Sequence, residues 1–419
     1  MTAPLQGLRV VESTSYVAGP LAGMTLAQLG AEVIRIDSIK GASDAGRWPL
    51  SRNGTSLFWA GLNKGVKSIG VDLSSPAGQE VATALITAPG DDAGLFVDNT
   101  VGRACFAYEH LRARRADLVH VHIQGYPDDS PAMDYAVNPR FGVPMLTRPL
   151  DTDRPVNHVL PAWDIATGQL AVSGLLAGLR RRSVDGRGSR IDLALADVAA
   201  AHVAHLGWLA EVAERGQDRP RLGNHLFGAF GVDFVCGDGG RVIAVAITRQ
   251  QWRDLVRVTC TEAVFAALAS VHGADFSVEG ERFENRSLIE AVLAPWFARH
   301  TVPEVIAAAK GTRVMIGEFR SVSEVVSSYR SGAESAVLTE IDQPGFGPML
   351  TATSPLRWDT DYAATAPAPR FGDDTEWALT ELLGLSAHEI AVLVDNGTVH
   401  PGTSRTRPTP ERRDLHATV

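Results

Sequence analysis

The stretch LRVVESTSYVAGPLAGMTLAQLGAEVIRID, residues 8–37, decides the expected fold class. Residues 8–11 form a short apolar run that is typical of a buried strand, and residues 32–37 form a second one. Residues 21–29 between them have the composition of a helix, which Gly30 ends. A strand, a helix and a second strand in this order predict a β-α-β unit and therefore a parallel sheet.

Asp37 closes the second strand at a position where dinucleotide-binding proteins carry an acidic residue. The glycine fingerprint of those proteins is missing, because the turn at residues 17–23 reads VAGPLAG. We therefore exclude a nicotinamide cofactor. Backbone atoms of this turn are still expected to be able to bind another nucleotide.

The remaining pattern predicts an α/β protein with two domains. Further strands are expected at residues 68–73, 94–97, 117–123 and 190–196, with a helix at residues 76–87. From about residue 225 the pattern changes to two strands, at residues 231–234 and 241–247, followed by helices near residues 250–258, 262–269, 288–299 and 302–310. The predicted division is a large domain (1–216), a linker (217–224), a smaller α+β domain (225–330), a return to the large domain (331–400) and a disordered tail (401–419).

Composition narrows the protein class. The chain has 419 residues, a formal net charge of −9 and no long basic run, so nucleic acid is not an expected partner. Three widely spaced cysteines fit neither a disulfide framework nor a metal site, which indicates a reducing cytoplasm. No signal peptide is visible, and no apolar run reaches the roughly 20 residues that span a bilayer. The expected protein is cytoplasmic, with no membrane partner.

A second stretch, NHVLPAWDIATGQLAVSGLLAGLRRRSVDGRGSR at residues 157–190, directs attention to one carboxylate. The apolar run at residues 159–163 stops at Asp164, and apolar residues then recur at helical spacing. Three arginines, at residues 180–182, end the helix where cations suit its dipole. The pattern places Asp164 at the start of a helix.

Asp164 has two compatible interpretations. An Asp directly before a helix is most often an N-cap, whose carboxylate accepts backbone N–H bonds. Those same N–H groups would keep the carboxylate ionised, and an ionised carboxylate with little bulk beside it can attack an acyl carbon. Asp197 is expected to cap the next helix, which the pattern extends to about Glu214. Spacing alone does not separate an N-cap from a nucleophile.

Two other segments are expected to have a structural role. Residues 41–55 are polar and contain glycine, which predicts a surface loop. His120 and His122 lie on one face of a strand, and no third ligand occurs at metal-site spacing, so we expect core histidines and no metal.

Four segments resemble the family III CoA-transferases, also called the CaiB/BaiF family. They are PLQGLRVVES with AGPLAGMTLAQLGAEVIRID (4–13 and 18–37), SLFWAGLNKGVKSIGVDLSSPAGQE (56–80), AWDIATGQLAVSGLLAGLRRRSVDGRGSRIDLALAD (162–197) and APAPRFGDDTEWALTELLGLSAHEI (366–390). The resemblance covers nearly the whole chain. It implies an interlocked-ring homodimer in which each chain has a Rossmann-like large domain and a small domain.

The resemblance also implies the site residues. Asp164 occupies the position of the family's catalytic aspartate. Positions that match the family's CoA contacts are Val17, Ala18, Val71, Asp72, Leu73, Ser74, Asn99 and Arg103. Ser38 replaces the usual basic residue after the second strand, which puts one CoA phosphate contact in doubt. Coenzyme A enters as part of the acyl-CoA substrate, and no prosthetic group is expected.

Within the family, residues 17–37, 157–169 and 218–234 most resemble an intramolecular CoA transferase that acts on mesaconyl-CoA. This implies transfer of CoA between the C1 and C4 carboxyls of one diacid through an aspartyl-CoA intermediate, with backbone N–H donors near Gly168 for the oxyanions. The first alternative is an intermolecular acyl-CoA:carboxylate CoA-transferase. An acyl-CoA racemase is a weaker one, because a racemase of this family has a His where this chain has Met133 before Asp134.

Overall fold

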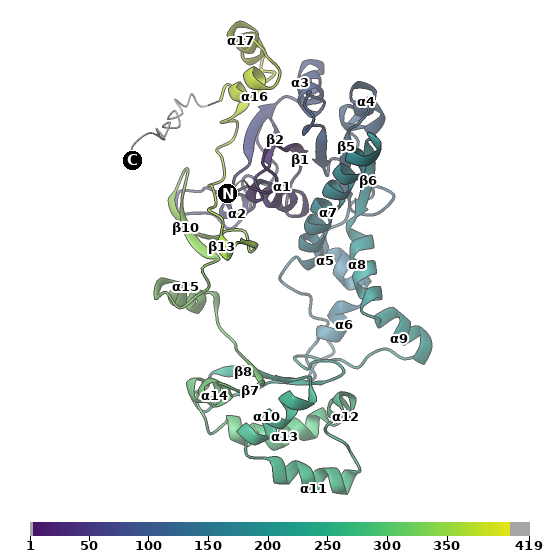
Figure 1. Cartoon of the computed structure of the whole chain (residues 1–419), viewed down its shortest axis with the longest axis vertical. Helices are drawn as coiled ribbons and strands as arrows, with labels where there is room; N and C mark the ends of the chain where they lie inside the picture. The colour runs from purple at the N-terminus through teal and green to yellow at the C-terminus, as the bar shows by residue number, and fades with distance from the viewer. Residues whose placement is uncertain (1–2, 403–419) are drawn as a thin grey trace, which may run out of the picture. The chain divides into compact units, whose positions relative to one another are not determined.

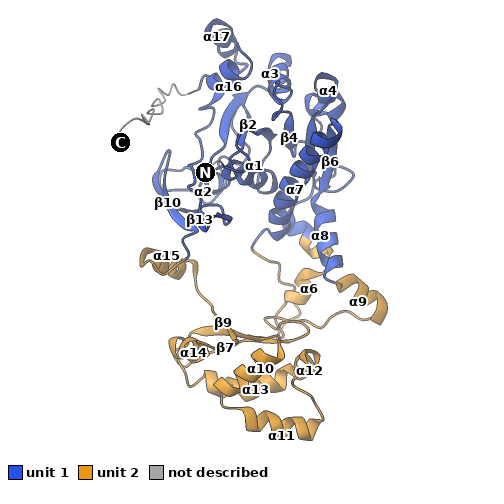
Figure 2. Ribbon diagram, in the orientation of Figure 1, with its two compact units in different colours: residues 1–137, 160–206, 335–419 blue, residues 138–159, 207–334 orange. Residues whose placement is uncertain are grey.

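The computed structural model describes residues 3–402 and divides the chain into two compact units (Figure 2). Unit 1 takes residues 1–137, 160–206 and 335–419, and unit 2 takes residues 138–159 and 207–334. The segment 138–159, which the sequence assigned to the large domain, thus belongs to unit 2. Most of the tail at 401–419 that we predicted to be disordered, residues 403–419, lies outside the described residues.

Unit 1 is built on one parallel sheet of six strands in the order β3-β2-β1-β4-β5-β6 (Figure 1). The strands are β1 (Arg9–Ser13), β2 (Glu32–Ser38), β3 (Lys67–Val71), β4 (Leu95–Asp98), β5 (Val119–Gln124) and β6 (Ser189–Ala194). Every neighbouring pair is parallel, so the predicted parallel sheet is confirmed. From the central pair β1 and β4, successive strands are added outward in both directions, as in doubly wound folds.

Helices cover both faces of this sheet. On one face α1 (Ala18–Gln28) and the long α7 (Ala162–Asp185) lie side by side, and Leu26 and Leu175 join the strands' apolar residues in the core (Figure 1). On the other face Leu85 and Leu379 belong to a second core. The other helices of this unit are α2 (Leu57–Leu62), α3 (Pro76–Ile86), α4 (Tyr108–Arg114), α8 (Leu195–His205), α16 (Thr375–Glu381) and α17 (Ala387–Asp395), with a 3₁₀ turn at Ala104–Phe106; α5 (Asp134–Arg140) begins in unit 1.

Glycines allow α1 to lie unusually close to its neighbours. A Cβ on Gly23 would lie 2.0 Å from Oε2 of Glu12 on β1. A Cβ on Gly168 of α7 would lie 2.7 Å from the carbonyl oxygen of Ala18. Both distances are shorter than Cβ atoms tolerate, and at Gly168 the neighbour is backbone, which cannot easily give way. The close packing fixes the first turn of α1, which follows β1 after a loop of four residues.

The boundaries of two helices correct the sequence analysis. Helix α7 begins at Ala162 with Pro161 at the N-cap position, so Asp164 is its third residue and not its cap. Helix α8 begins at Leu195, which places Asp197 in the first turn rather than at the cap. The helix expected to reach Glu214 ends at His205 and resumes as α9 (Trp208–Arg215) in unit 2, because Gly207 adopts φ 76° and breaks the helical path.

Unit 2 contains an antiparallel sheet of three strands, in the order β7-β8-β9, with helices packed on it. The strands are β7 (Phe230–Val235), β8 (Arg241–Ala246) and β9 (Met315–Glu318); the helices include α6 (Val143–Thr147), α10 (Arg249–Val258), α11 (Glu262–His272), α12 (Glu279–Glu284), α13 (Arg286–Phe297), α14 (Val302–Ala309) and α15 (Val322–Arg330). Its core is rich in aromatic residues such as Phe230, Trp252 and Phe297. The expected α+β character of this part is present.

Short hairpins complete unit 1 after the chain returns from unit 2. They are formed by β10 (Leu338–Gln343) with β11 (Gly347–Ala352), and by β12 (Arg357–Trp358) with β13 (Asp361–Tyr362). No helix within residues 3–402 is both long enough and apolar enough to span a bilayer.

Candidate active site

A pocket opens at the carboxyl edge of the parallel sheet, where the strand order reverses between β1 and β4. Its cavity of about 470 Å³ is lined at the ends of three neighbouring strands: by residues 15–18 after β1, by Asn99 after β4, and by residues 123–125 at the end of β5. Ligands of open parallel sheets bind in this position, because the loops diverge there and leave a crevice. Asp164 also lines this pocket.

The start of α7 is capped by a carboxylate from elsewhere in the chain. Oδ2 of Asp134 accepts hydrogen bonds from the backbone N–H of Trp163, at 2.6 Å, and of Asp164, at 3.2 Å. Asp134 is buried and lies against the positive end of the helix dipole, which favours its negative charge. The cap that the sequence assigned to Asp164 is thus supplied by Asp134, and the Asp164 side chain is left to line the pocket.

The pKa of Asp164 is raised to about 6, and not lowered as we expected from first-turn amides. Burial is the main cause, the nearby Asp134 carboxylate adds to it, and the charge of Arg47 acts in the opposite direction. The prediction failed because Asp134 takes the amide bonds that would have stabilised the ionised form. At neutral pH Asp164 is ionised and more basic than an ordinary aspartate, which favours attack on an acyl carbon.

The loop after β1 is held in a strained shape by polar contacts. Tyr16 adopts φ 68°, which is uncommon for a residue with a side chain. Its N–H donates to Oδ2 of Asp44 at 2.8 Å, and Asp44 forms a buried ion pair with Arg35 at 3.0 Å. Asn99 binds Ser15 twice: Oδ1 accepts from its N–H at 3.1 Å, and Nδ2 donates to its carbonyl at 3.0 Å. These bonds fix the backbone at Val17 and Ala18.

The expected CoA contacts fall into two groups at the same edge of the sheet. Val17, Ala18 and Asn99 line the Asp164 pocket, whereas residues 71–74 and Arg103 do not. The second group is itself connected, because Nη1 of Arg103 donates to the carbonyl of Leu73 at 3.3 Å. The structure therefore brings three predicted contacts together with Asp164 and the other five into a separate cluster.

Within this second group the side chains differ in accessibility. Val71 and Leu73 are buried in the core, so only their backbone remains for a ligand. Asp72 accepts hydrogen bonds from the hydroxyl of Ser74, at 2.5 Å, and from its N–H, at 3.1 Å, and these bonds keep the pKa of its carboxyl low. The charge of Lys40 contributes a smaller lowering of the same pKa.

At Ser38 the structure offers a neighbouring cation. Ser38 Oγ accepts a hydrogen bond from the backbone N–H of Lys40 at 3.3 Å. Lys40 is exposed. It is therefore available near the position where the family usually has a basic residue.

The two core histidines share a third polar partner that sequence spacing did not reveal. Nε2 of His120 and Nδ1 of His122 lie 2.8 Å and 2.7 Å from Oδ1 of Asp98, which is opposite His122 on β4. The three ligand atoms are close enough to hold a metal ion. Their separations are those of hydrogen bonds, and these bonds raise the pKa of His122 and lower that of Asp98. The arrangement is a hydrogen-bonded network.

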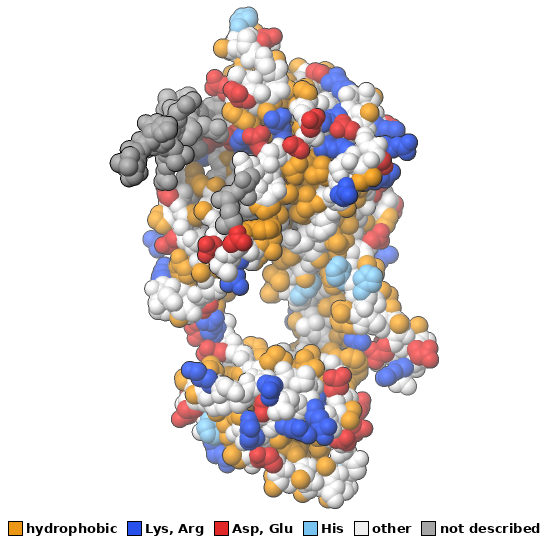
Figure 3. Space-filling model, viewed as in Figure 1, with side chains coloured by type: hydrophobic (Ala, Val, Ile, Leu, Met, Phe, Trp, Pro, Cys, Tyr) orange, Lys and Arg blue, Asp and Glu red, His pale blue; other side chains and the backbone are white. Residues whose placement is uncertain are grey.

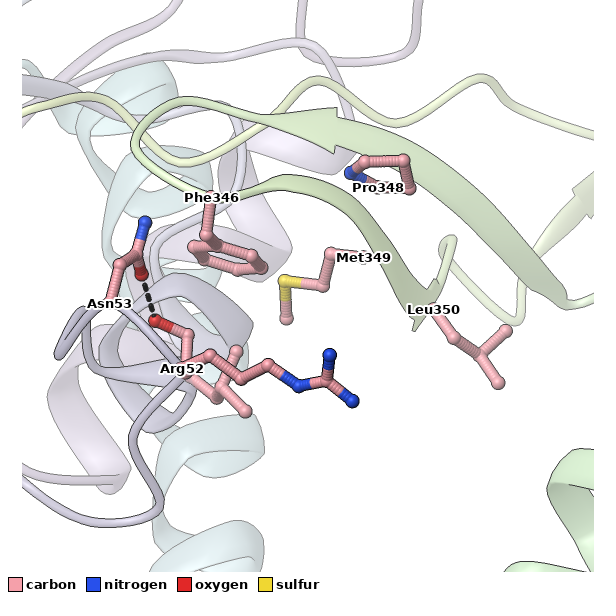
Figure 4. A pocket seen from close by; sticks show the side chains of 8 residues that line it. Arg52, Asn53, Phe346, Pro348, Met349 and Leu350 are labelled. Carbon is pink, nitrogen blue, oxygen red and sulfur yellow. Dashed lines mark hydrogen bonds between the residues drawn. The ribbon is translucent and has the colours of Figure 1, made fainter.

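A larger cavity of about 570 Å³ lies between residues 51–53 and β11 (Figure 4). Arg52 is the only charged side chain among the described residues that line it, beside Phe346, Met349 and Leu350. None of the predicted site residues lines this cavity. No carboxylate is among its described lining residues, so size alone does not identify the site.

The sequence analysis did not foresee the roles of two residues of the Asp164 pocket, Asp134 and Arg47. Asp134 caps a helix whose first residue lies 28 positions later, and no local spacing connects the two. Arg47 lies in the segment that we expected to be a plain surface loop. A usable signal existed for Arg47, since that loop follows the carboxyl end of a parallel strand, where ligands bind.

Known proteins resemble this chain over most of its length. It is 46% identical to the 2-methylfumaryl-CoA isomerase of Chloroflexus aurantiacus, over 95% of this chain and 98% of that enzyme. It is 27% identical to the succinate–glutarate CoA-transferase of Agrobacterium fabrum, over 90% of this chain and 96% of that protein. A solved structure of a CaiB/BaiF family protein from Brucella suis shares the fold, with a TM-score of 0.71, 24% identity, and coverage of 91% of this chain and 100% of the other.

A family profile also matches most of the chain. The sequence profile of CoA-transferase family III matches residues 5–375, which include the sheet, the Asp164 pocket and all of unit 2. The chain belongs to CoA-transferase family III.

Proposed function

We propose that the protein is an intramolecular CoA transferase that moves CoA between the C1 and C4 carboxyls of mesaconyl-CoA. The observation that carries this proposal is the 46% identity, over 95% of the chain, to a 2-methylfumaryl-CoA isomerase. The Asp164 pocket supports it, because it combines a basic carboxylate with the backbone of a fixed loop at the ligand-binding edge of the sheet.

The proposed reaction begins with attack of an Asp164 carboxylate oxygen on the C1 thioester carbonyl. The C–S bond breaks, and a mixed anhydride and CoA thiolate are formed. The thiolate then attacks the aspartyl carbonyl, which gives aspartyl-CoA and the free diacid. The C4 carboxylate of the diacid attacks the aspartyl thioester and releases the thiolate again. The thiolate finally attacks the C4 acyl carbonyl, and Asp164 is regenerated.

This sequence of steps exchanges one thioester and one carboxylate for another such pair, so it requires no net energy input. The anhydride and thioester steps each pass through an oxyanion, which backbone N–H groups can stabilise. Gly168 is a poor candidate for such a donor, because it lies in α7 and packs against the Ala18 carbonyl. The strained loop at residues 15–18 lines the pocket and is the better candidate.

In this proposal CoA lies along the carboxyl edge of the sheet. Val17, Ala18 and Asn99 contact its thiol end, and the cluster of Val71, Asp72, Leu73, Ser74 and Arg103 contacts the remainder. Lys40 takes the place of the basic residue that is missing at Ser38. Coenzyme A is part of the substrate, and the chemistry above assigns no step to a prosthetic group or a metal. The active form is a homodimer in the cytoplasm.

Intermolecular transfer between an acyl-CoA and a free acid is the alternative function within the family, as in the named activity of the Agrobacterium fabrum relative. Racemisation is disfavoured by a specific observation: Met133 lines the pocket, and none of the described lining residues is a histidine that could move a proton at the α-carbon.

The test is to supply mesaconyl-C1-CoA with no free acid and to follow the C4 isomer by chromatography. The proposal predicts complete equilibration of the two isomers. Isotopically labelled mesaconate added to a parallel reaction should enter the product slowly or not at all. A strict requirement for added acid, with full incorporation of label, would instead establish intermolecular transfer.

A further inference from the structure

The pocket around Asp164 contains three carboxylates and a single cation. Asp129, Asp134 and Asp164 line it, and Arg47 is the one cationic side chain among its described lining residues. An anionic group that enters this pocket is repelled by the three carboxylates, and Arg47 is its one favourable charged partner.

The guanidinium of Arg47 is oriented but not neutralised. Its central carbon lies 5.6 Å from the ring centre of Tyr16 and 5.0 Å from that of Phe58, and both rings line the same pocket. Such cation–π contacts hold the guanidinium in place without neutralising its charge, so it can still donate N–H bonds to an anion. Within residues 3–402 no carboxylate lies within 4.0 Å of it.

The backbone at Arg47 is anchored to the buried network beneath the pocket. Its N–H donates to the carbonyl of Asp44 at 3.1 Å, and its own carbonyl accepts from the hydroxyl of Ser56 at 2.5 Å. Asp44 is paired with buried Arg35 and also binds the N–H of Tyr16. The loop that carries Arg47 is therefore fixed relative to the loop that lines the nucleophile's pocket.

We propose that Arg47 binds the free carboxylate of the acyl group and makes the pocket selective for dicarboxylic acyl groups. This inference rests on the function proposed above, and it adds the residue that recognises the end of the substrate that does not react. A guanidinium suits this task, because it can bind a carboxylate with two parallel N–H···O bonds.

The same contact explains how one active site serves both halves of the reaction. While the C1 thioester reacts with Asp164, the C4 carboxylate is bound to Arg47. Once the diacid is free, Asp164 is held as aspartyl-CoA, and the diacid is a dianion beside the two remaining carboxylates, Asp129 and Asp134. Arg47 is what retains it. When C4 attacks aspartyl-CoA, the C1 carboxylate replaces it at Arg47.

The experiment compares two acyl-CoA substrates that differ only at this end. Mesaconyl-C1-CoA carries the C4 carboxylate, and (E)-2-methylbut-2-enoyl-CoA carries a methyl group in its place. The full-length wild type, Arg47→Met and Arg47→Lys are each incubated with either substrate and hydroxylamine. The readouts are the rate at which Asp164 is trapped as a hydroxamate, kcat and KM for isomerisation, and the free mesaconate released.

Wild type should be trapped by mesaconyl-CoA on the order of 10³-fold more efficiently than by the methyl analogue. Arg47→Met should lose most of that discrimination, because trapping with mesaconyl-CoA falls much further than trapping with the analogue. Arg47→Lys should retain part of it, since the charge remains but the two-pronged geometry is lost. Arg47→Met should also release free mesaconate. The ratio between substrates is the decisive quantity, because removing this charge also raises the pKa of Asp164 and slows both reactions alike.

Arg52→Met is the matched control, since Arg52 lies five residues away and lines the other cavity. It should leave the ratio unchanged. Two results for Arg47→Met would overturn the role of Arg47 but not the proposed function. One is an equal loss of trapping with mesaconyl-CoA and with the methyl analogue. The other is normal trapping with an unchanged ratio between the two substrates. If wild type itself gives neither isomer nor hydroxamate from mesaconyl-CoA, the proposed function fails instead.

Discussion

At the residue scale, the central feature is that Asp164 occupies a place that is unfavourable for its charge. Burial and the neighbouring Asp134 raise its pKa to about 6, and only the charge of Arg47 opposes this. The residue type and its position near a helix start were predictable from the sequence. The sign of the pKa shift was not, because it depends on Asp134, which the chain brings in from another segment.

This placement predicts a cost in stability that a neutral substitute removes. Because its pKa is higher in the folded protein, this carboxyl keeps its proton to higher pH when folded than when unfolded. The folded protein therefore loses stability as the pH rises from about 4, and the loss is complete once the pH has passed 6. Asp164→Asn should therefore be more stable than wild type by about 1 to 2 kcal/mol at pH 7.5, and by less at pH 5. Urea unfolding at both pH values measures this. A variant that is less stable at pH 7.5 would contradict it.

Glu12 gives a second prediction at this scale. It is fully buried, both carboxyl oxygens are without a hydrogen-bond partner among the described residues, and burial raises its pKa to about 8. In the unfolded chain the pKa returns to its usual 4.5, so between pH 5 and 8 the folded state holds a proton that the unfolded state lacks. Wild type should therefore lose about 1.4 kcal/mol of stability per pH unit relative to Glu12→Gln in this range, and the difference should become constant above pH 8. Thermal unfolding from pH 5 to 9 tests this, and parallel curves between pH 5 and 8 would show that Glu12 is ionised at neutral pH.

At the element scale, α7 shows which boundaries a sequence can specify. Its apolar spacing and the stop at Gly186 were readable, and the helix does end there, with Gly186 at φ 70°. Its start was misplaced by three residues, because Asp164 was assumed to be the N-cap, whereas the N-cap position is Pro161. The observed cap, Asp134, makes its bonds across 29 and 30 residues.

The packing of α7 on α1 gives a prediction with an internal control. Gly168→Ala would place a Cβ 2.7 Å from the Ala18 carbonyl, so the loop at the pocket must shift. We expect a loss of about 1 to 3 kcal/mol in stability and weaker acyl-CoA binding. Gly174→Ala, in the same helix, meets only Ile191 at 3.5 Å and should be neutral or stabilising by up to about 1 kcal/mol. Urea unfolding and equilibrium binding compare the two; similar behaviour of both variants would contradict the packing argument.

At the scale of the whole molecule, the parallel sheet and the α+β character of unit 2 were predictable because apolar periodicity is a local signal. The observed order of the strands is that of the Rossmann-like domain that the family resemblance implied. The passage of residues 138–159 into unit 2 was not predictable, since that polar, proline-containing segment has no periodicity that assigns it to either unit.

The homodimer remains a prediction that the surface supports. Apolar side chains gather on the face of unit 1 over α1 and α7 (Figure 3), and Leu160, Leu170 and Met133 are exposed. Exposed apolar area of this kind is typical of a surface that a partner covers. Sedimentation equilibrium should give twice the 44.7 kDa chain mass, with no folded monomer at micromolar concentration. A stable folded monomer would contradict the prediction.

The central claim is that Asp164 forms a covalent bond to the acyl group and then to CoA. The most direct test is peptide mapping after turnover of mesaconyl-CoA in the presence of hydroxylamine. We predict a hydroxamate on the peptide that contains Asp164 in wild type, and none in Asp164→Asn. The variant should keep its fold, because Asp164 is not the helix cap, but isomerisation should fall by several orders of magnitude with the loss of the covalent route. An unmodified Asp164 peptide, with Asp164→Asn isomerising mesaconyl-CoA at near the wild-type rate, would contradict the account.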